Sequence, residues 1–245
     1  MILLIDIGNT RIKWAQLSAG KLSQPSAIVY KQKTIDSNLT AEWQGIPLPS
    51  KIYLASVSST ELKQQLINVA EHLWPDISIQ EIYTVKSALG VTNAYSEPFK
   101  LGIDRWLAML AAFHYHKTAV CVVDCGTAIT LDVIDQQGMH LGGMIMPGLS
   151  LLKQALSKGT ADLNICPEIH QQGLANYTEA AIFNGTISAI KGFIESGLAQ
   201  YEQPVLLVLT GGDADFILAR LKLDASVDKA LVLKGLALLV NEQVE

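Results

Sequence analysis

Two stretches of this 245-residue chain repeat the same order of residue types. Residues 3–17 read LLIDIGNTRIKWAQL, and residues 121–135 read CVVDCGTAITLDVID. In each, an apolar run leads to an aspartate, a glycine and a threonine follow closely, and an alternating pattern typical of a second strand comes next. Asp6 and Asp124 occupy the matching positions. The sequence therefore predicts two β-hairpins, each with an aspartate at the end of its first strand.

A second pair of stretches repeats in the same order along the chain. Residues 51–66 (KIYLASVSSTELKQQL) and 205–221 (VLLVLTGGDADFILARL) each indicate a strand, a turn of small residues and the start of a helix. Together the repeats predict an α/β protein with two duplicated domains, residues 1–116 and 117–245, flanking a central cleft. Small ligands usually bind at such an interface between domains.

Composition narrows the class of protein. Hydrophobic residues make up 49% of the chain and charged residues 17%, which is typical of a well-packed globular protein. A net charge of -5 without a dense run of Lys and Arg argues against a nucleic-acid partner. The N-terminal apolar run is too short for a signal sequence, and no stretch reaches the roughly 18 apolar residues of a membrane helix. Three cysteines without a CxxC pair fit a reducing compartment. We therefore expect a cytoplasmic protein with neither nucleic acid nor membrane as a partner.

The two predicted turns offer groups that bind phosphate and metal ions. Backbone N–H groups and the side chains of Thr and Asn cradle phosphate oxygens, and a carboxylate beside them can hold the metal ion that neutralises the phosphates. The chain contains neither the GxxxxGK[ST] phosphate loop nor the GxGxxG dinucleotide motif. The expectation of a nucleotide site therefore depends on the repeated hairpins.

Two helices are predicted close to polar residues of interest. Helix-forming residues at helical spacing follow Gly102, which puts Asp104 and Arg105 in the first turn of a helix that begins at Ile103. The helix dipole favours an acid in a first turn, and the same carboxylate is suited to accept a proton. A second helical pattern covers residues 176–201, with Thr178 expected to cap it.

Five short motifs resemble those of a known enzyme family. The DIGNT stretch at residues 6–10, DCGTA at 124–128 and TGGDA at 210–214 resemble the phosphate-1, phosphate-2 and adenosine motifs of the acetate and sugar kinase/Hsp70/actin superfamily. GIDR at 102–105, together with GGMIMPGLSLL at 142–152, is similar to the motifs of type III pantothenate kinases. The resemblance implies two ribonuclease H-like domains in the actin-like ATPase fold. It also implies ATP-dependent phosphorylation of pantothenate to 4'-phosphopantothenate, the first step of coenzyme A biosynthesis.

The resemblance further implies a role for each residue that matches a family motif. The residues expected to bind ATP are Asp6, Ile7, Gly8, Asn9, Thr10, Arg11, Ile12, Lys13 and Thr127. Those expected to bind pantothenate are Tyr95, Gly102, Ile103, Asp104, Arg105 and Thr178. Asp104 resembles the proton acceptor, Asp6 the residue that holds the magnesium of ATP, and Asp124 the residue that binds an activating potassium or ammonium ion. The resemblance also implies a homodimer.

Two other functions fit the same motifs. One is a kinase of another small hydroxy acid, which only a screen of acceptors would separate from a pantothenate kinase. The other is a nucleotide-binding regulatory protein of the same fold. The negative net charge and the lack of a helix-turn-helix pattern argue against a regulator, and the Asp104–Arg105 pair favours catalysis.

Overall fold

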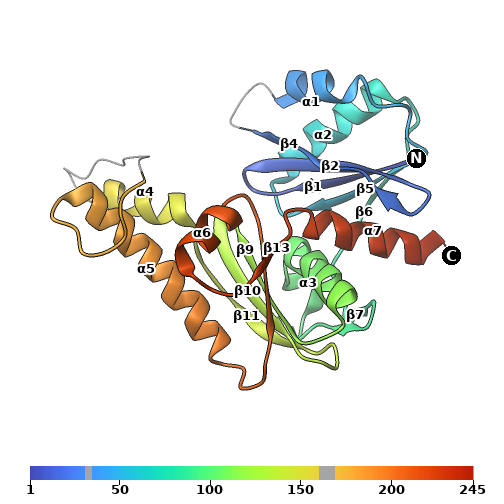
Figure 1. Cartoon of the computed structure of the whole chain (residues 1–245). Helices are drawn as coiled ribbons and strands as arrows, with labels where there is room; N and C mark the ends of the chain where they lie inside the picture. Colours follow the sequence, from blue (N-terminus) through green and yellow to red (C-terminus); the bar gives the residue numbers. More distant parts are fainter. Residues whose placement is uncertain (31–34, 160–168, 245) are drawn as a thin grey trace. The chain divides into compact units, whose positions relative to one another are not determined.

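The computed structural model describes residues 1–30, 35–159 and 169–244, which form two compact units (Figure 1). The first unit consists of residues 1–115 and 230–245, and the second of residues 116–229. None of the described helices is long and apolar enough to cross a membrane.

The first unit is built around a sheet in which strands are paired in the order β3-β2-β1-β5-β6, with β4 also paired to β2. Its elements are β1 (Ile2–Ile7), β2 (Arg11–Ser18), β3 (Lys21–Leu22), β4 (Ser26–Val29), α1 (Ile35–Trp43), β5 (Lys51–Ser56), α2 (Thr60–Leu73), β6 (Ile79–Glu81), β7 (Ser87–Ala88), β8 (Val91–Thr92), the 3-10 helix η1 (Pro98–Lys100), α3 (Ile103–His116) and α7 (Leu231–Val244). β1 pairs with β2 in the antiparallel direction and with β5 in the parallel direction.

The two faces of this sheet are covered by different helices (Figure 1). Alternate residues of β1 and β5 pack with α1 and α2 in one apolar cluster, which includes Leu3, Ile5 and Leu54. Leu4 and Tyr53 are also buried but, being one residue out of phase, point to the opposite face. α7 packs against β1, β2 and β5 on that side.

The sheet of the second unit has the strand order β11-β10-β9-β12-β13, which corresponds to β3-β2-β1-β5-β6 in the first unit. Its elements are β9 (Val120–Cys125), β10 (Ala128–Ile134), β11 (His140–Pro147), α4 (Leu149–Gly159), α5 (Thr178–Leu198), β12 (Leu206–Thr210), α6 (Ala214–Leu221) and β13 (Ser226–Val227). β9 is antiparallel to β10 and parallel to β12, as β1 is to β2 and β5.

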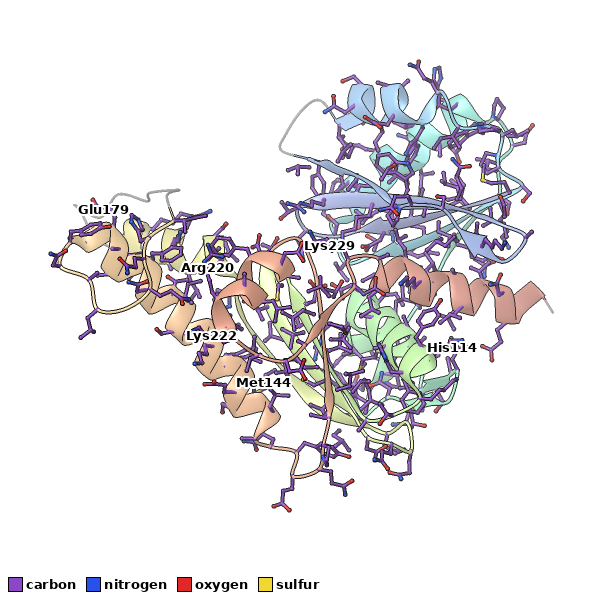
Figure 2. All side chains as sticks on the ribbon, in the orientation of Figure 1. His114, Met144, Glu179, Arg220, Lys222 and Lys229 are labelled. Carbon is purple, nitrogen blue, oxygen red and sulfur yellow. The ribbon has the colours of Figure 1, made fainter. Side chains whose placement is uncertain are left out.

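Helices α5 and α6 cover one face of this second sheet. Side chains of both helices share an apolar cluster with alternate residues of β9, β10 and β12. α5 comes close to the sheet at Gly197, where a Cβ would stand 2.9 Å from the end of the Met144 side chain. Met144 is labelled in Figure 2. On α6, the Arg220 guanidinium lies 3.5 Å from the centre of the Phe216 ring (Figure 2).

The predicted hairpins and strand–turn–helix segments are confirmed, but the compact units differ from the predicted domains at the C-terminus. Residues 230–245 were expected in the second domain and are part of the first unit. The reason is the apolar surface of α7, which covers the first sheet, and the absence of a side chain at Gly235, where a Cβ would overlap the Leu107 carbonyl of α3. The division into homologous domains at residues 116 and 117, and the cleft between them, stay predictions.

Candidate functional site

The turn between β1 and β2 carries the first set of predicted site residues. Asp6 is the next-to-last residue of β1 and is 6% exposed. In register it lies opposite Lys13 of β2 and beside Ala55 of β5. The Gly8 N–H donates to the Arg11 carbonyl at 3.0 Å and closes the turn. The first phosphate motif therefore forms a tight hairpin turn with a carboxylate at its base.

The residues predicted to bind ATP differ in what they expose. Asn9 and Arg11 are exposed at the turn. The side chains of Ile7 and Ile12 are fully buried in the core of the first unit. These two isoleucines can therefore contact a nucleotide only through their backbone groups.

Tyr30, which sequence analysis missed, holds this turn from the side. Its N–H donates to the Thr10 carbonyl at 3.1 Å, and its hydroxyl donates to the Gly8 carbonyl at 2.5 Å. The Ser58 hydroxyl lies 3.1 Å from the Tyr30 hydroxyl. Tyr30 is 22 residues from Gly8 and Ser58 is 28 from Tyr30, so no local pattern links them.

A second group of predicted residues lies at the start of α3. Asp104 is in the first turn, as expected, and its Oδ1 accepts from the Arg105 N–H at 2.8 Å. The Gly102 carbonyl accepts the N–H of Trp106 at 3.0 Å, which begins the helix. A Cβ at Gly102 would stand 2.6 Å from Asp104 Oδ1. Glycine at this position therefore leaves room for the Asp104 carboxylate.

Arg105 and Tyr95 are in direct contact. Arg105 is 7% exposed, and its Nη1 donates to the Tyr95 hydroxyl at 3.1 Å. The Tyr95 N–H donates to Asn93 Oδ1 at 2.9 Å, and Asn93 Nδ2 donates to the Pro98 carbonyl at 3.3 Å. The fully buried Asn93, another residue that sequence analysis missed, therefore fixes the segment that carries Tyr95.

A cavity of about 170 Å³ adjoins the same part of the first unit. It is lined by residues 56–57, 82–84 and 99–103, which come from the ends of β5 and β6 and from the segment leading into α3. Val57 in its wall is 3.8 Å from where a Gly102 Cβ would stand. The cavity thus reaches the turn that precedes Asp104.

In the second unit, the turn between β9 and β10 is held by backbone contacts. The Gly126 N–H donates to the Ala128 carbonyl at 3.1 Å, and the Thr127 carbonyl accepts from the Gly148 N–H at 2.9 Å. A Cβ at Gly148 would overlap the Gly126 carbonyl and stand 2.7 Å from the Thr127 carbonyl. Thr127 itself is exposed. The GGMIMPG stretch therefore supports the second phosphate motif.

The Asp124 carboxylate lies close to other polar groups. In register, Asp124 is beside Thr130 of β10 and Thr210 of β12. A Cβ at Gly211, whose φ is +92°, would overlap Asp124 Oδ1. Burial, followed by the charges of Asp124 and Asp213, raises the pKa of the Cys125 thiol well above its ordinary value. The buried Cys125 thiol therefore lies close to the carboxylates of Asp124 and Asp213.

Thr178 does not have the predicted capping role. It is the first residue of α5, and the N-cap is Tyr177, whose side chain makes no capping hydrogen bond. The Tyr177 hydroxyl instead pairs with His170 Nδ1 at 3.0 Å. Thr178 is exposed and lies in the second unit, whereas the other residues predicted to bind pantothenate lie in the first.

The arrangement limits how a metal ion could be held. In the described parts of the chain, no three or more His, Cys, Asp and Glu side chains gather into a metal site. A magnesium or potassium ion at Asp6 or Asp124 would therefore depend on phosphate, backbone and water oxygens for the rest of its ligands. This is the usual situation for magnesium bound together with a nucleotide.

Comparison with known proteins decides the family. A family model described as type III pantothenate kinase matches residues 2–200. A type III pantothenate kinase from Nitrosococcus oceani is 37% identical, over 97% of this chain and 92% of its own length. The chain belongs to the type III pantothenate kinase family. It is therefore a kinase of the kind that phosphorylates pantothenate in coenzyme A biosynthesis, and the family uses ATP with a divalent metal.

Two solved structures share the fold. A Campylobacter jejuni protein assigned to the Baf family of transcriptional activators has a TM-score of 0.64 and 24% identity, covering 99% of this chain and 98% of its own. The activator of 2-hydroxyisocaproyl-CoA dehydratase from Clostridium difficile, solved with bound ADPNP, has a TM-score of 0.56 and 12% identity, covering 100% and 98%. The predicted actin-like α/β fold is confirmed.

Proposed function

We propose that this kinase transfers the γ-phosphoryl group of ATP to the primary hydroxyl of pantothenate through the residues gathered at the start of α3. The observation that carries this proposal is the arrangement of Asp104, Arg105 and Tyr95. A carboxylate and a guanidinium stand on consecutive residues, and Tyr95 accepts a hydrogen bond from that guanidinium at 3.1 Å. Pantothenate carries a carboxylate and a hydroxyl, the two groups that such a pair would recognise.

Arg105 would bind the pantothenate carboxylate, because a planar guanidinium forms paired hydrogen bonds with a carboxylate. Asp104 would orient the attacking hydroxyl and accept its proton. The proton leaves as the oxygen forms its bond to the γ-phosphorus, and the bond from that phosphorus to the β,γ-bridging oxygen breaks, leaving ADP. Gly102 supports these roles by leaving space for the Asp104 carboxylate.

The turn at Gly8–Thr10 would bind ATP phosphates through its backbone and side chains. Thr127, exposed at the equivalent turn of the second unit, is likewise proposed to bind ATP. Asp6 would hold the magnesium ion that accompanies ATP. The place of Asp6, next to last in β1 at the base of the turn, supports this role, because a carboxylate beside phosphate-binding groups can hold the metal ion of a nucleotide. Magnesium supplies neutralisation of the charge that moves from the γ- to the β-phosphate.

Asp124 would bind an activating monovalent cation, potassium or ammonium. The support is the register of Asp124, which lies beside Thr130 and Thr210 next to the turn after β9. Oxygen ligands of this kind suit hard cations. The position of Asp124, equivalent to that of Asp6 in the other hairpin, suits an ion beside the phosphates.

The kinase is further proposed to act as a homodimer in the cytoplasm. β11 is the edge strand of its sheet, and Leu141 and Ile145 on it are 52% and 61% exposed. An edge strand with exposed apolar side chains favours pairing with another chain. Sedimentation of the full chain beside Ile145→Lys tests this, and a monomeric mass for the unchanged protein would contradict it.

The central experiment compares Asp104→Asn with Glu61→Gln. Glu61 is the acid in the first turn of α2, so its substitution controls for loss of charge near a helix N-terminus. Asp104→Asn should fold and bind both substrates, while kcat with pantothenate falls roughly 10²–10⁴-fold, the usual contribution of a general base. Glu61→Gln should keep kcat.

Two outcomes would contradict the proposal. A near-normal kcat with a lowered Tm in Asp104→Asn would make Asp104 a structural residue. Turnover of another hydroxy acid in preference to pantothenate, with Asp104→Asn still inactive, would keep the mechanism and change the substrate.

A further inference from the structure

We propose that Tyr30 is a positioning residue that sets the orientation of the peptide groups in the turn between β1 and β2. This inference rests on the proposed binding of ATP phosphates by residues 8–10. Tyr30 follows β4 directly and is half-buried. It belongs to none of the motifs by which the family is recognised.

Tyr30 forms hydrogen bonds with the turn on both sides of Asn9. Its backbone N–H holds the Thr10 carbonyl, and its side-chain hydroxyl holds the Gly8 carbonyl. The residue between them, Asn9, is exposed at the tip. Tyr30 therefore fixes the orientation of two peptide groups, the one between Gly8 and Asn9 and the one between Thr10 and Arg11.

The direction of the hydrogen bonds around the Tyr30 hydroxyl follows from the chemistry of its partners. A carbonyl oxygen only accepts, so the Tyr30 proton is used on Gly8. The Ser58 hydroxyl, 3.1 Å away, must then donate to the Tyr30 oxygen. The result is a one-way series from Ser58 through Tyr30 to the Gly8 carbonyl.

This series determines where the Asn9 N–H points. The Gly8 carbonyl and the Asn9 N–H belong to the same planar peptide group, and no described peptide bond is cis. In a trans peptide these two groups point in opposite directions. With the carbonyl held towards Tyr30, the Asn9 N–H points away from it, as a donor available to a phosphate oxygen.

The Gly8 N–H cannot take that part, because it donates to the Arg11 carbonyl. The Gly8 N–H thus closes the turn, and the Asn9 N–H is the donor that remains for a phosphate oxygen. Without the Tyr30 hydroxyl, rotation of the Gly8–Asn9 peptide would turn that donor away. Glycine offers little resistance to such a rotation, because it has no Cβ to restrict φ and ψ.

Ser58 connects the turn to the segment beside the α3 start. The neighbouring Val57 donates its N–H to the Ile7 carbonyl at 3.1 Å and lines the cavity next to Gly102. Ser58 supports Tyr30 but does not contact the turn through any described hydrogen bond of its own. Its loss should therefore have a smaller effect than the loss of the Tyr30 hydroxyl.

The experiment measures kcat and both KM values for Tyr30→Phe, Ser58→Ala, Thr10→Ala and Ser87→Ala in the intact kinase. Tyr30→Phe should raise the KM for ATP about 3- to 10-fold, the range expected from loss of one neutral hydrogen bond. The KM for pantothenate should stay within about 2-fold of its normal value, since a single peptide orientation in the donor turn is altered. Ser58→Ala should shift the KM for ATP in the same direction by a smaller factor.

Ser87→Ala is the control, because it also removes one side-chain hydroxyl hydrogen bond in the first unit, the 3.2 Å contact with the Thr92 hydroxyl. It should leave the KM for ATP unchanged. An unchanged KM for ATP in Tyr30→Phe, or an equal rise of both KM values, would overturn the inference while Thr10→Ala still raises the KM for ATP. If Thr10→Ala also leaves that KM unchanged, the proposed phosphate turn itself is wrong.

Discussion

The turn after β1 and the turn after β9 occupy the same place in two sheets of the same strand order, yet they are held in different ways. Hydroxyl groups of Tyr30 and Ser58 support the first turn. The second is supported by the backbone of Gly148, packed so closely that no side chain fits there. Loss of one hydrogen bond in the first turn frees a single peptide group to rotate, whereas an added methyl group in the second turn meets backbone atoms that must shift.

The same comparison extends to the strands that lead into the turns. Counting from the matching aspartates, Cys125 is equivalent to Ile7 and Cys121 to Leu3. All four side chains are fully buried. The second copy therefore places thiols where the first has branched aliphatic residues, and these thiols lie near carboxylates.

The matching aspartates should give the largest effects and the clearest difference between the two copies. Asp124→Asn should reduce turnover roughly 10²–10³-fold, as loss of a fixed charge in an active site usually does. It should also abolish the response to added potassium. Asp6→Asn should instead increase the magnesium concentration needed for half-maximal rate. Initial rates in potassium, ammonium and sodium buffers, each with a magnesium titration, measure both.

Full activity of the unchanged enzyme in a sodium-only buffer would contradict the assignment of Asp124. Loss of the same ion response in both variants would show that the two carboxylates share one role, and the contrast between the hairpins would disappear.

Substitution of Gly148 tests the backbone-held turn. Gly148→Ala should lower the free energy of unfolding by about 1–3 kcal/mol, the usual cost of overpacking, because the Cβ meets backbone that cannot rotate away. Gly192→Ala is the control, since Gly192 is exposed in α5 with no atom within 4 Å of its Cβ position. Gly192→Ala should raise the free energy of unfolding by about 0.5–1 kcal/mol. Urea unfolding of both variants measures these free energies. An unchanged free energy of unfolding for Gly148→Ala would contradict the proposal that backbone packing holds the second turn.

The buried thiols should give the smallest effect on function. Burial and the charge of Asp132 raise the pKa of Cys121 to about 12, and the pKa of Cys125 is raised too. At pH 8.5 an ordinary thiol is about half ionised, but these two stay protonated. Iodoacetamide should therefore leave both unmodified in the native kinase, and mass spectrometry of digested protein checks this.

The same shift predicts a pH dependence of stability. Unfolded thiols ionise above about pH 9, whereas the folded ones keep their protons, so the free energy of unfolding should fall as pH rises from about 9 towards 12. Rapid alkylation of native Cys125 at pH 8.5 would contradict the burial on which this depends.

Local patterns in the sequence predicted much of the fold. The apolar runs, the glycine turns and the helical spacing after Gly102 depend on residues close together in the chain, and the corresponding strands and α3 are present. Tyr95 and Arg105 are in contact, while the predicted roles of both in binding pantothenate stay predictions. The start of α5 was less accurate, because a helix was expected over 176–201 and is formed by Thr178–Leu198, with Tyr177 as N-cap.

Other features depend on contacts between distant segments and carried no recognisable signal. Tyr30, Ser58 and Asn93 form hydrogen bonds that place site segments, but each is a common polar residue in a stretch without a motif. The place of α7, in the first compact unit although the predicted second domain extends to residue 245, has a related reason. Its apolar pattern predicts burial, but the sequence does not reveal which sheet it covers.

The place of α7 has a consequence for how the kinase is made. Residues 116–229 are one continuous piece of chain, whereas the first unit needs residues 230–245 to be complete. A ribosome delivers the chain from its N-terminus, and units generally fold as they emerge. The sheet face that carries Leu4 and Tyr53 therefore lacks α7 until residues 230–245 have been synthesised. The first unit is therefore completed only after the whole of the second unit has been synthesised.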